Sequence, residues 1–224
     1  IRNNEKRNIW VGMARETAHQ LGTPISSLMG WMEWLKKKPN DQDKIINDIS
    51  IDIDRLQQVS DRFSKMGSET QLKETHLSGI IDDVVLYFDR RIPSMGKSII
   101  IENQLDLNIK IRANGVLISW AIENVIKNAI DALENEGIIA LTSKIDKKYI
   151  YIKIEDSGKG ILRKDWKNIF RPGFSTKEQG WGLGLSLTLR IIKDIHGGDI
   201  YVSKSQPGKG SIIEISLPKL VDIN

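Results

Sequence analysis

Apolar residues recur at alternating steps of three and four through the first part of the chain, the spacing that gathers them along one side of a helix. The first run comprises Trp10, Met13, Thr17, Leu21, Pro24, Leu28, Trp31 or Met32, and Leu35. The second run comprises Ile45, Ile49, Ile53 or Asp52, Leu56, Val59, Phe63 and Met66. Between them lies Pro39, which disfavours helix in the residue before it. The pattern therefore predicts a helix over about residues 4–37 and a second helix that ends at Gly67.

Two helices joined by a short turn form an antiparallel helical hairpin. Such a hairpin has one apolar seam and little core of its own. Two copies would bury their seams together, so the pattern predicts a homodimer that forms a four-helix bundle. The alternative is a seam that packs on a second domain of the same chain.

Beyond a polar segment that suits a linker, helix-like and strand-like patterns are mixed. Helices are expected over residues 77–90, 116–133 and 183–196, and strands over 98–102, 109–112, 138–145, 149–155, 199–204 and 211–217. Because strands and helices do not alternate regularly, we expect an α+β sandwich with helices on one face of a mixed sheet. The predicted organisation is a hairpin at 1–68, a linker at 69–75 and an α+β domain at 76–224.

Composition narrows the partners and the compartment. The 224 residues are 40% hydrophobic, which suffices for folded cores, and the net charge is +4. The longest basic run, Lys36-Lys37-Lys38, ends the first helix, where cations complement the helix dipole, so we expect no nucleic-acid partner. The absence of cysteine fits a reducing cytoplasm, and no run of eighteen apolar residues could cross a bilayer. Because the chain begins without methionine, we expect a fragment of a longer protein that makes no membrane contact itself.

Five short motifs follow one another in the second half of the chain. They are Glu123–Ala129, Asp156–Gly160, Ile169–Lys177, Gly180–Leu185 and Gly208–Ser211. Their order and spacing resemble the N, G1, phenylalanine, G2 and G3 boxes of the ATPase family that contains sensor histidine kinases, Hsp90, gyrase and MutL. With the histidine-and-proline segment Glu16–Ile25 upstream, the chain resembles the catalytic core of a bacterial two-component sensor histidine kinase. The resemblance implies ATP and Mg²⁺ as cofactors, and a cytoplasmic portion of an inner-membrane protein.

The helix expected at 116–133 carries a polar side. Its members, spaced by three and four, are Glu123, Asn124, Lys127, Asn128 and Asp131. Amide oxygens can join phosphate oxygens and water around Mg²⁺. By the resemblance, Asn128 holds the metal and Asn124 lies near the metal or the phosphates, with Lys127 and Asp131 as further nucleotide contacts. The alternative is a solvated helix face.

Asp156 closes a predicted strand, where its carboxylate can accept a hydrogen bond from the adenine amino group. Gly158 and Gly160 let the backbone turn tightly and come close to a planar base. This arrangement resembles the family's adenine-recognition aspartate, and Ser211 would support it through its hydroxyl or a water. An ordinary glycine turn explains the segment around Ser211 almost as well.

Gly180, Gly182 and Gly184 precede a helix, so their amides, with that of Leu183, can bind a triphosphate at the helix N-terminus. No strand precedes the run and no βαβ unit surrounds it, which argues against a dinucleotide. By the resemblance, residues 163–179 form a mobile lid over ATP. Lys177 would reach the phosphates from this lid, and Phe170 and Phe174 would anchor it.

His19 lies off the seam of the first helix, on its flank, with Thr23 one turn further and Pro24 bending the axis. The resemblance implies that His19 attacks the γ-phosphorus of ATP and that the phosphoryl group then passes to an aspartate of a response regulator receiver domain. It places the Thr23 hydroxyl where it orients a water for dephosphorylation of the regulator. The family usually has Glu or Asp after the histidine. Gln20 can orient the ring but cannot act as a base, so we expect slower autophosphorylation.

Three other functions remain open. A degenerate or phosphatase-biased relative of these kinases would bind nucleotide and regulator but transfer poorly, and Gln20 is the feature that favours it. An ATPase of the Hsp90 or MutL sort would use a glutamate one turn before the metal-binding asparagine to activate water. That position is Asn124 here, and Glu123 is one residue off. A serine kinase of mitochondrial type would leave the His19 segment unexplained.

Overall fold

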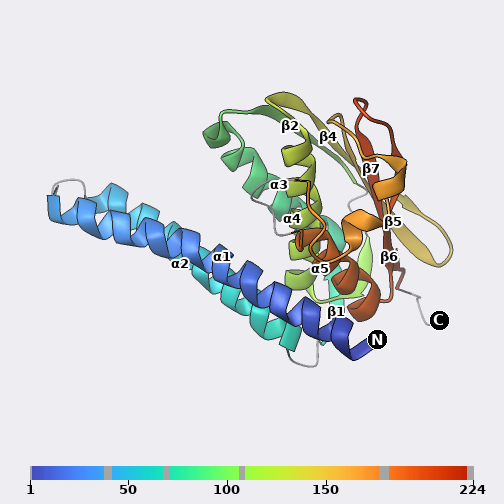
Figure 1. The fold of residues 1–224 in the computed structure, drawn as a ribbon, viewed down its shortest axis with the longest axis horizontal. Coiled ribbons are helices and arrows are strands. Elements are labelled where there is room, and N and C mark those ends of the chain that lie inside the picture. The colour runs from blue at the N-terminus through green and yellow to red at the C-terminus, as the bar shows by residue number, and fades with distance from the viewer. Residues whose placement is uncertain (1, 38–41, 68–70, 106–108, 177–181, 221–224) are drawn as a thin grey trace. The chain divides into compact units, whose positions relative to one another are not determined.

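The computed structural model describes residues 2–37, 42–67, 71–105, 109–176 and 182–220 (Figure 1). The chain forms two compact units, Ile1–Glu69 and Thr70–Asn224. None of the described helices is both long and apolar enough to cross a membrane.

The first unit contains two long helices, α1 (Arg2–Lys37) and α2 (Gln42–Gly67), which pack against each other. The sequence left two positions on their seam open, and the structure decides both. Trp31 is half-buried while Met32 is 58% exposed, and Asp52 is 7% exposed while Ile53 is 53% exposed. Trp31 Nε1 donates to Asp52 Oδ2 at 3.0 Å. This hydrogen bond explains how a carboxylate is tolerated at a buried position.

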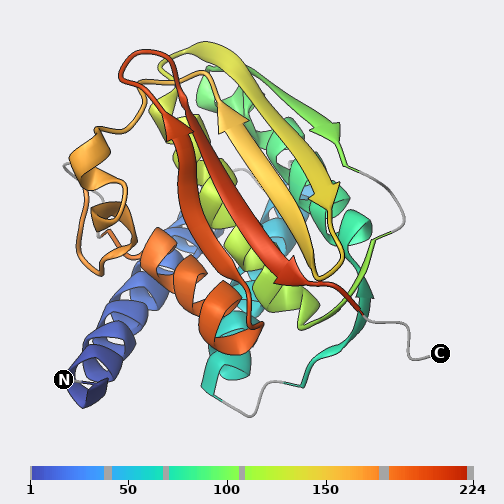
Figure 2. The same cartoon turned by 90° about the vertical axis from the view of Figure 1, so that its right-hand side faces the viewer.

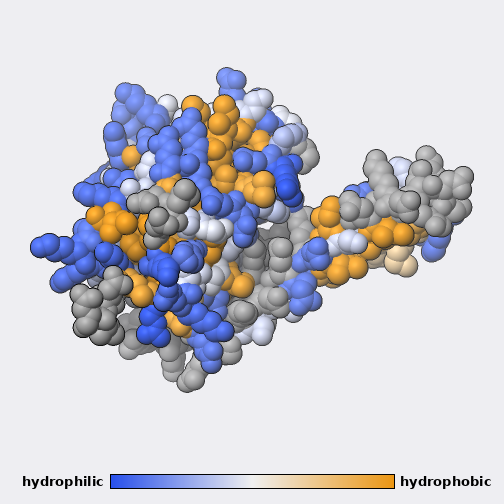
Figure 3. All heavy atoms as spheres, turned by 180° about the vertical axis from the view of Figure 1, so that it is seen from behind, coloured by the Kyte–Doolittle hydropathy of each residue, from blue (hydrophilic) through white to orange (hydrophobic). Residues whose placement is uncertain are grey.

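A second set of apolar side chains on these two helices is exposed. It comprises Ile25, Met29 and Met32 on α1, and Ile46, Ile51 and Ile53 on α2. Figure 3 shows hydrophobic residues gathered over the helices of this unit. The steps of four and three on α1, and of seven from Ile46 to Ile53 on α2, keep these residues in a stripe along each helix, whereas Ile51 lies on another side of α2. Stripes of this kind are typical of a surface that another helix covers.

The second unit is a mixed sheet with helices against one face (Figure 2). Its helices are α3 (Leu77–Arg91), α4 (Gly115–Ala132) and α5 (Gly184–Arg190), which the π-helix η5 (Ile191–Ile195) continues, and short 3-10 helices lie at η2 (Pro93–Met95), η3 (Arg163–Asp165) and η4 (Asn168–Phe170). The strands are β1 (Lys73–His76), β2 (Ser98–Gln104), β3 (Lys110–Ala113), β4 (Glu136–Ile145), β5 (Tyr149–Asp156), β6 (Asp199–Ser205) and β7 (Ser211–Pro218). The α+β architecture predicted from the sequence is confirmed.

The main sheet has the strand order β2-β4-β5-β7-β6. β2 pairs parallel with β4, and the other neighbours are antiparallel. Alternation along β5 buries Ile150, Ile152 and Ile154, each at most 1% exposed, on the side that the helices cover. Ile118 and Ile122 of α4 are fully buried, so this helix fills the centre of the core.

A small separate sheet leads into α4. Strand β1, which includes residues 73–75 of the predicted linker, pairs antiparallel with β3. Lys110 Nζ lies 2.7 Å from Glu74 Oε1 across this pair. Asn114 follows β3 directly and caps α4, since its side chain accepts the backbone N–H of Leu117 at 3.2 Å. At the other end of α4, Lys97 Nζ donates to the carbonyl oxygens of Ile130 at 2.9 Å and Leu133 at 2.7 Å. Both ends of α4 are therefore held.

Candidate functional site

The polar side of α4 carries the two asparagines that the sequence singled out. Asn124 and Asn128 are half-buried, whereas Lys127 and Asp131 are exposed. Asn128 Nδ2 donates to the backbone oxygen of Asn124 at 2.8 Å, and Asn124 Nδ2 donates to the carbonyl of Gly184 at 3.4 Å. Because each amide nitrogen is used in this way, the orientation of each amide oxygen is set. Oxygen ligands of this kind suit Mg²⁺, so the two residues fit the metal role proposed for them.

Asp156 ends β5 with its side chain almost covered, at 6% exposed. Its Oδ1 accepts the backbone N–H of Gly158 at 2.9 Å. Burial raises the pKa of the Asp156 carboxyl above its usual value, and hydrogen bonds from the backbone N–H groups of Gly158 and Ser211 oppose this rise. A buried carboxylate gains from each further donor, so this site favours a ligand that presents an N–H group.

Three glycines let the segments around Asp156 come together. A Cβ on Gly158 would lie 2.5 Å from the carbonyl oxygen of Ala132, at the end of α4. Gly160 has φ +73° and its Cβ would overlap the carbonyl oxygen of Gln206. Gly210 has φ +87° and its Cβ would overlap the carbonyl oxygen of Asp156 itself. The Asp156–Gly160 motif therefore packs on both the end of α4 and the last motif.

Ser211 is buried beside Asp156 but contacts it through the backbone. Its hydroxyl oxygen lies 3.1 Å from Ser205 Oγ, which also accepts the backbone N–H of Ile161 at 2.7 Å. The sequence analysis expected the Ser211 hydroxyl or a water to support the aspartate. In the structure, the hydroxyl contacts Ser205 instead, and Ser211 adjoins Asp156 through the pairing of β5 with β7.

The glycine run meets α4 at the start of α5. Gly182 has φ +63°, its carbonyl accepts the backbone N–H of Gly173 at 3.1 Å, and a Cβ there would lie 2.5 Å from the carbonyl carbon of Phe174. The carbonyl of Gly184, which contacts Asn124, also accepts the Thr188 hydroxyl at 2.9 Å. Leu183 is half-buried, and its carbonyl accepts a hydrogen bond from Ser186 Oγ. Sequence analysis missed Thr188, although a hydroxyl four residues after a helix-starting glycine is a signal for such a bond.

The segment predicted as a lid is partly described. Phe170 is buried and Phe174 is half-buried. Trp166 Nε1 donates to the carbonyl of Ile161 at 3.2 Å, and the Arg163 guanidinium lies 3.8 Å from the centre of the Trp166 ring. Lys177 and Gly180 lie outside the described residues.

His19, Gln20 and Thr23 are all part of α1. Their side chains lie outside the described part of the structure. Pro24 is inside α1 and buried, as the seam pattern predicted.

The described site thus joins three groups of atoms with different chemistry. Asp156 supplies a buried acceptor, Asn124 and Asn128 supply amide oxygens, and Gly182 and Gly184 bring backbone amides to the N-terminus of α5. The carbonyl of Gly184 links the second group to the third directly. A ligand with an amino group at one end and phosphates at the other would match this order of groups.

Comparison with known proteins decides the family. Residues 113–221 match the family of histidine kinase-, DNA gyrase B-, and HSP90-like ATPases. The solved catalytic domain of the histidine kinase ThkA is 30% identical to this chain, with a TM-score of 0.59, over 66% of this chain and 96% of that domain. This chain belongs to the histidine kinases. The resemblance found in the sequence is confirmed, and the ATPase family implies that the kinase binds ATP.

Two longer matches extend beyond the ATPase domain. Sporulation kinase C of Bacillus subtilis (strain 168) is 28% identical over 221 residues, which is 97% of the kinase chain and 51% of that protein. A crystal structure of ThkA in complex with the response regulator protein TrrA covers 99% of the kinase chain and 65% of that chain, with 26% identity and a TM-score of 0.60. The kinase chain spans about half the length, or less, of the first curated relatives that it matches.

Proposed function

We propose that this kinase transfers the γ-phosphoryl group of ATP to His19 and then to an aspartate of a response regulator receiver domain. The observation that carries the proposal is the arrangement around α4. Asp156 lies at its C-terminal end, and Gly184 contacts Asn124 in its middle. The adenine amino group would bind at Asp156 and the phosphates near Gly184. The solved complex of ThkA with TrrA supports the regulator as a partner.

The transfer to His19 is an in-line displacement at phosphorus. An unprotonated imidazole nitrogen forms the new P–N bond while the bond from the γ-phosphorus to the bridging oxygen breaks, and its electron pair leaves with ADP. Asn128, with Asn124, would hold Mg²⁺, which neutralises phosphate charge when bound. Gln20 orients the ring by a hydrogen bond. The proton on the other ring nitrogen then leaves to solvent or to Glu16, because the amide of Gln20 cannot accept it as a base.

The first experiment incubates the protein with γ-labelled ATP and Mg²⁺ and then treats it with acid or alkali. We expect label that survives alkali, is lost in acid and is absent from His19→Ala. His76→Ala, which removes an exposed histidine of β1, is the matched control and should label normally. Nucleotide binding without label would instead favour the degenerate or phosphatase-biased kinase.

Gln20→Glu tests whether the missing base limits the first step. A carboxylate in that position can accept the imidazole proton, and general bases typically contribute about 10²–10⁴-fold when well placed. We expect the initial rate of His19 labelling to rise severalfold. Gln57→Glu on α2 makes the same charge change on the other helix and should leave the rate unchanged. A change of less than about twofold with Gln20→Glu would rule out the base as the limiting factor.

The proposal includes a homodimer formed by α1 and α2. The exposed stripes on these helices, among them Met29 and Ile53, provide the apolar surface that a second copy would cover. Thr23 on α1 would orient the water that hydrolyses the regulator's phosphoaspartate. The molar mass in solution tests the dimer, and a mass of one chain would contradict it.

A further inference from the structure

A buried histidine joins the end of the π-helix to the start of α4. His196 is 5% exposed. Its Nδ1 lies 2.7 Å from the carbonyl oxygen of Ile191, and its Nε2 lies 3.1 Å from the backbone nitrogen of Asn114. The carbonyl can only accept and the backbone N–H can only donate, so the ring is neutral with its proton on Nδ1. Both nitrogens of His196 are therefore used to hold other elements.

The segment formed by α5 and η5 has one contact at each of its own ends, to the middle of α4 and to the residue that caps α4. Its first residue, Gly184, accepts from Asn124, and the residue that follows it, His196, accepts from Asn114. The order of the partners is reversed, because the contact that comes first along α5–η5 is to Asn124 and the contact that comes last is to Asn114. The segments therefore run antiparallel. Hydrogen bonds are directional, whereas apolar contacts between helices allow sliding. The hydrogen bonds to Asn124 and Asn114 therefore define the register of α5–η5 along α4.

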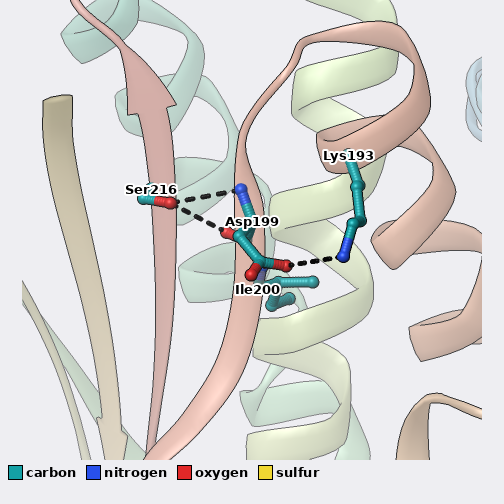
Figure 4. A network of polar contacts seen from close by, with 4 residues as sticks. All are labelled: Lys193, Asp199, Ile200 and Ser216. Carbon is teal, nitrogen blue, oxygen red and sulfur yellow. Dashed lines mark hydrogen bonds and ion pairs between the residues drawn. The ribbon is translucent and has the colours of Figure 1, made fainter. Parts of the chain in front are cut away.

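The segments on either side of His196 are joined to the sheet, and Figure 4 shows the contacts of Asp199. The backbone N–H of Gly198 donates to the carbonyl of Ile192 at 2.9 Å. Ser216 Oγ accepts the backbone N–H of Asp199 at 3.1 Å, and Lys193 Nζ lies 3.8 Å from Asp199 Oδ1. These contacts connect the π-helix to β6 and β7. The backbone on either side of His196 is therefore tied to the sheet, while the ring itself contacts Ile191 and Asn114.

We propose that His196 is a positioning residue that sets the register of α5 on α4, and thereby the position of Gly184 relative to Asn124 and Asn128. The inference rests on the proposed function, because it takes these residues as the phosphate and metal side of the nucleotide site. Loss of either hydrogen bond of the ring lowers nucleotide affinity without removing any group that touches the nucleotide.

Protonation of the His196 ring would break its hydrogen bond with Asn114 and so destabilise the folded protein. Burial lowers the pKa of His196 below its ordinary value, and the hydrogen bond to Ile191 opposes this. A proton on Nε2 would face the N–H of Asn114, so the contact exists only in the neutral form. The stabilisation is therefore present above the unfolded-state pKa and declines as the pH falls from there through the lower, folded-state pKa. Charged residues on the elements around His196 include Lys110 and Arg112 on β3, Glu123 on α4, Arg190 on α5, Lys193 and Asp194 on η5, Asp199 on β6 and Glu214 on β7.

The test measures calorimetric affinity for a non-hydrolysable ATP analogue with Mg²⁺ at pH values from 8 through 5.5 and lower. His196→Gln keeps one donor and one acceptor but does not titrate, whereas His196→Leu has neither. At pH 8 we expect wild type and His196→Gln to agree within about twofold and His196→Leu to bind about tenfold more weakly, since it leaves a buried N–H unpaired. As the pH is lowered from 8 through 5.5 and further, wild type should lose affinity relative to His196→Gln once the ring becomes protonated, which happens below the ordinary histidine range because burial lowers its pKa. Protonation of the nucleotide itself cancels in that ratio.

A constant ratio of wild-type to His196→Gln affinity over this range, with the His196 ring shown by NMR to become protonated within it, would overturn the inference, even if His196→Leu fails to fold. The same holds if a folded His196→Leu binds as wild type does. If wild type binds no nucleotide at any of these pH values, the proposed function fails and takes the inference with it. If all three proteins bind the nucleotide with the same pH dependence, the inference about His196 is wrong while the proposed function still stands.

Discussion

Gly210→Ala is expected to remove measurable ATP binding. At φ +87° an alanine would adopt a left-handed conformation, which costs about 1–2 kcal/mol. Its Cβ would also overlap the carbonyl oxygen of Asp156 and lie 2.9 Å from that residue's carbonyl carbon. These atoms belong to backbone, so the clash is relieved by moving β7 away from the end of β5. That movement breaks the pairing of Ser211 with Asp156 and displaces the carboxylate that would bind adenine.

Gly208→Ala is the matched control. Gly208 has a similar φ of +74°, but a Cβ there would meet no heavy atom within 4 Å. We expect Gly208→Ala to lose about 1 kcal/mol of unfolding free energy in urea and to keep its ATP affinity. The ATP affinities of both variants, measured by calorimetry, separate the effect of backbone strain at the glycine from the effect of displacing β7. Gly210→Ala that binds ATP within threefold of wild type would contradict the geometry described for the end of β5.

Asp156→Asn is expected to weaken ATP binding about 100-fold, the equivalent of about 3 kcal/mol. Asparagine keeps one oxygen that can accept from Gly158, but its NH₂ group replaces the second acceptor. A donor then faces the adenine amino group, or faces the N–H of Ser211. The same change should favour a base that presents a carbonyl, such as guanine. The ratio of ATP affinity to GTP affinity should therefore fall by a larger factor than the ATP affinity itself.

Asp146→Asn provides the control for this change. Asp146 lies at the other end of β5, is exposed, and accepts the backbone N–H groups of Lys148 and Tyr149, both at 2.7 Å. It removes the same charge from a comparable turn. Titration of both variants with ATP and with GTP gives the two ratios. Equal ATP affinity of Asp156→Asn and Asp146→Asn would show that Asp156 does not contact the base.

The sequence predicted most of the second unit because its core residues alternate clearly. The strand expected at 149–155 is β5, Tyr149–Asp156, and its isoleucines face the helices. β1 was missed because Lys73–His76 carries no apolar alternation, and its strand conformation depends on pairing with β3. The π-helix Ile191–Ile195 has the composition of an ordinary helix, so no local signal distinguishes its wider turn.

The candidate site could be predicted where a motif holds its residues close in sequence. Asp156 and Gly158 belong to one turn, and they can contact each other because they are only two residues apart. His196 and Asn114 are 82 residues apart, and nothing in either segment indicates that they meet. Trp31 and Asp52 illustrate the same limit in the first unit. Helical spacing allowed either Asp52 or Ile53 at the seam, and a hydrogen bond from the facing helix decided between them.

The strand order has a consequence for the time at which the kinase becomes active during synthesis. β5 lies between β4 and β7, and Ser211 in β7 pairs with Asp156 at the end of β5. A nascent chain that has exposed everything up to Phe174 therefore already carries His19, both asparagines and Asp156, yet its last-made strand is still inside the ribosome. We therefore expect nucleotide recognition to wait for the final hairpin of the domain, long after His19, the proposed phosphate acceptor, has emerged.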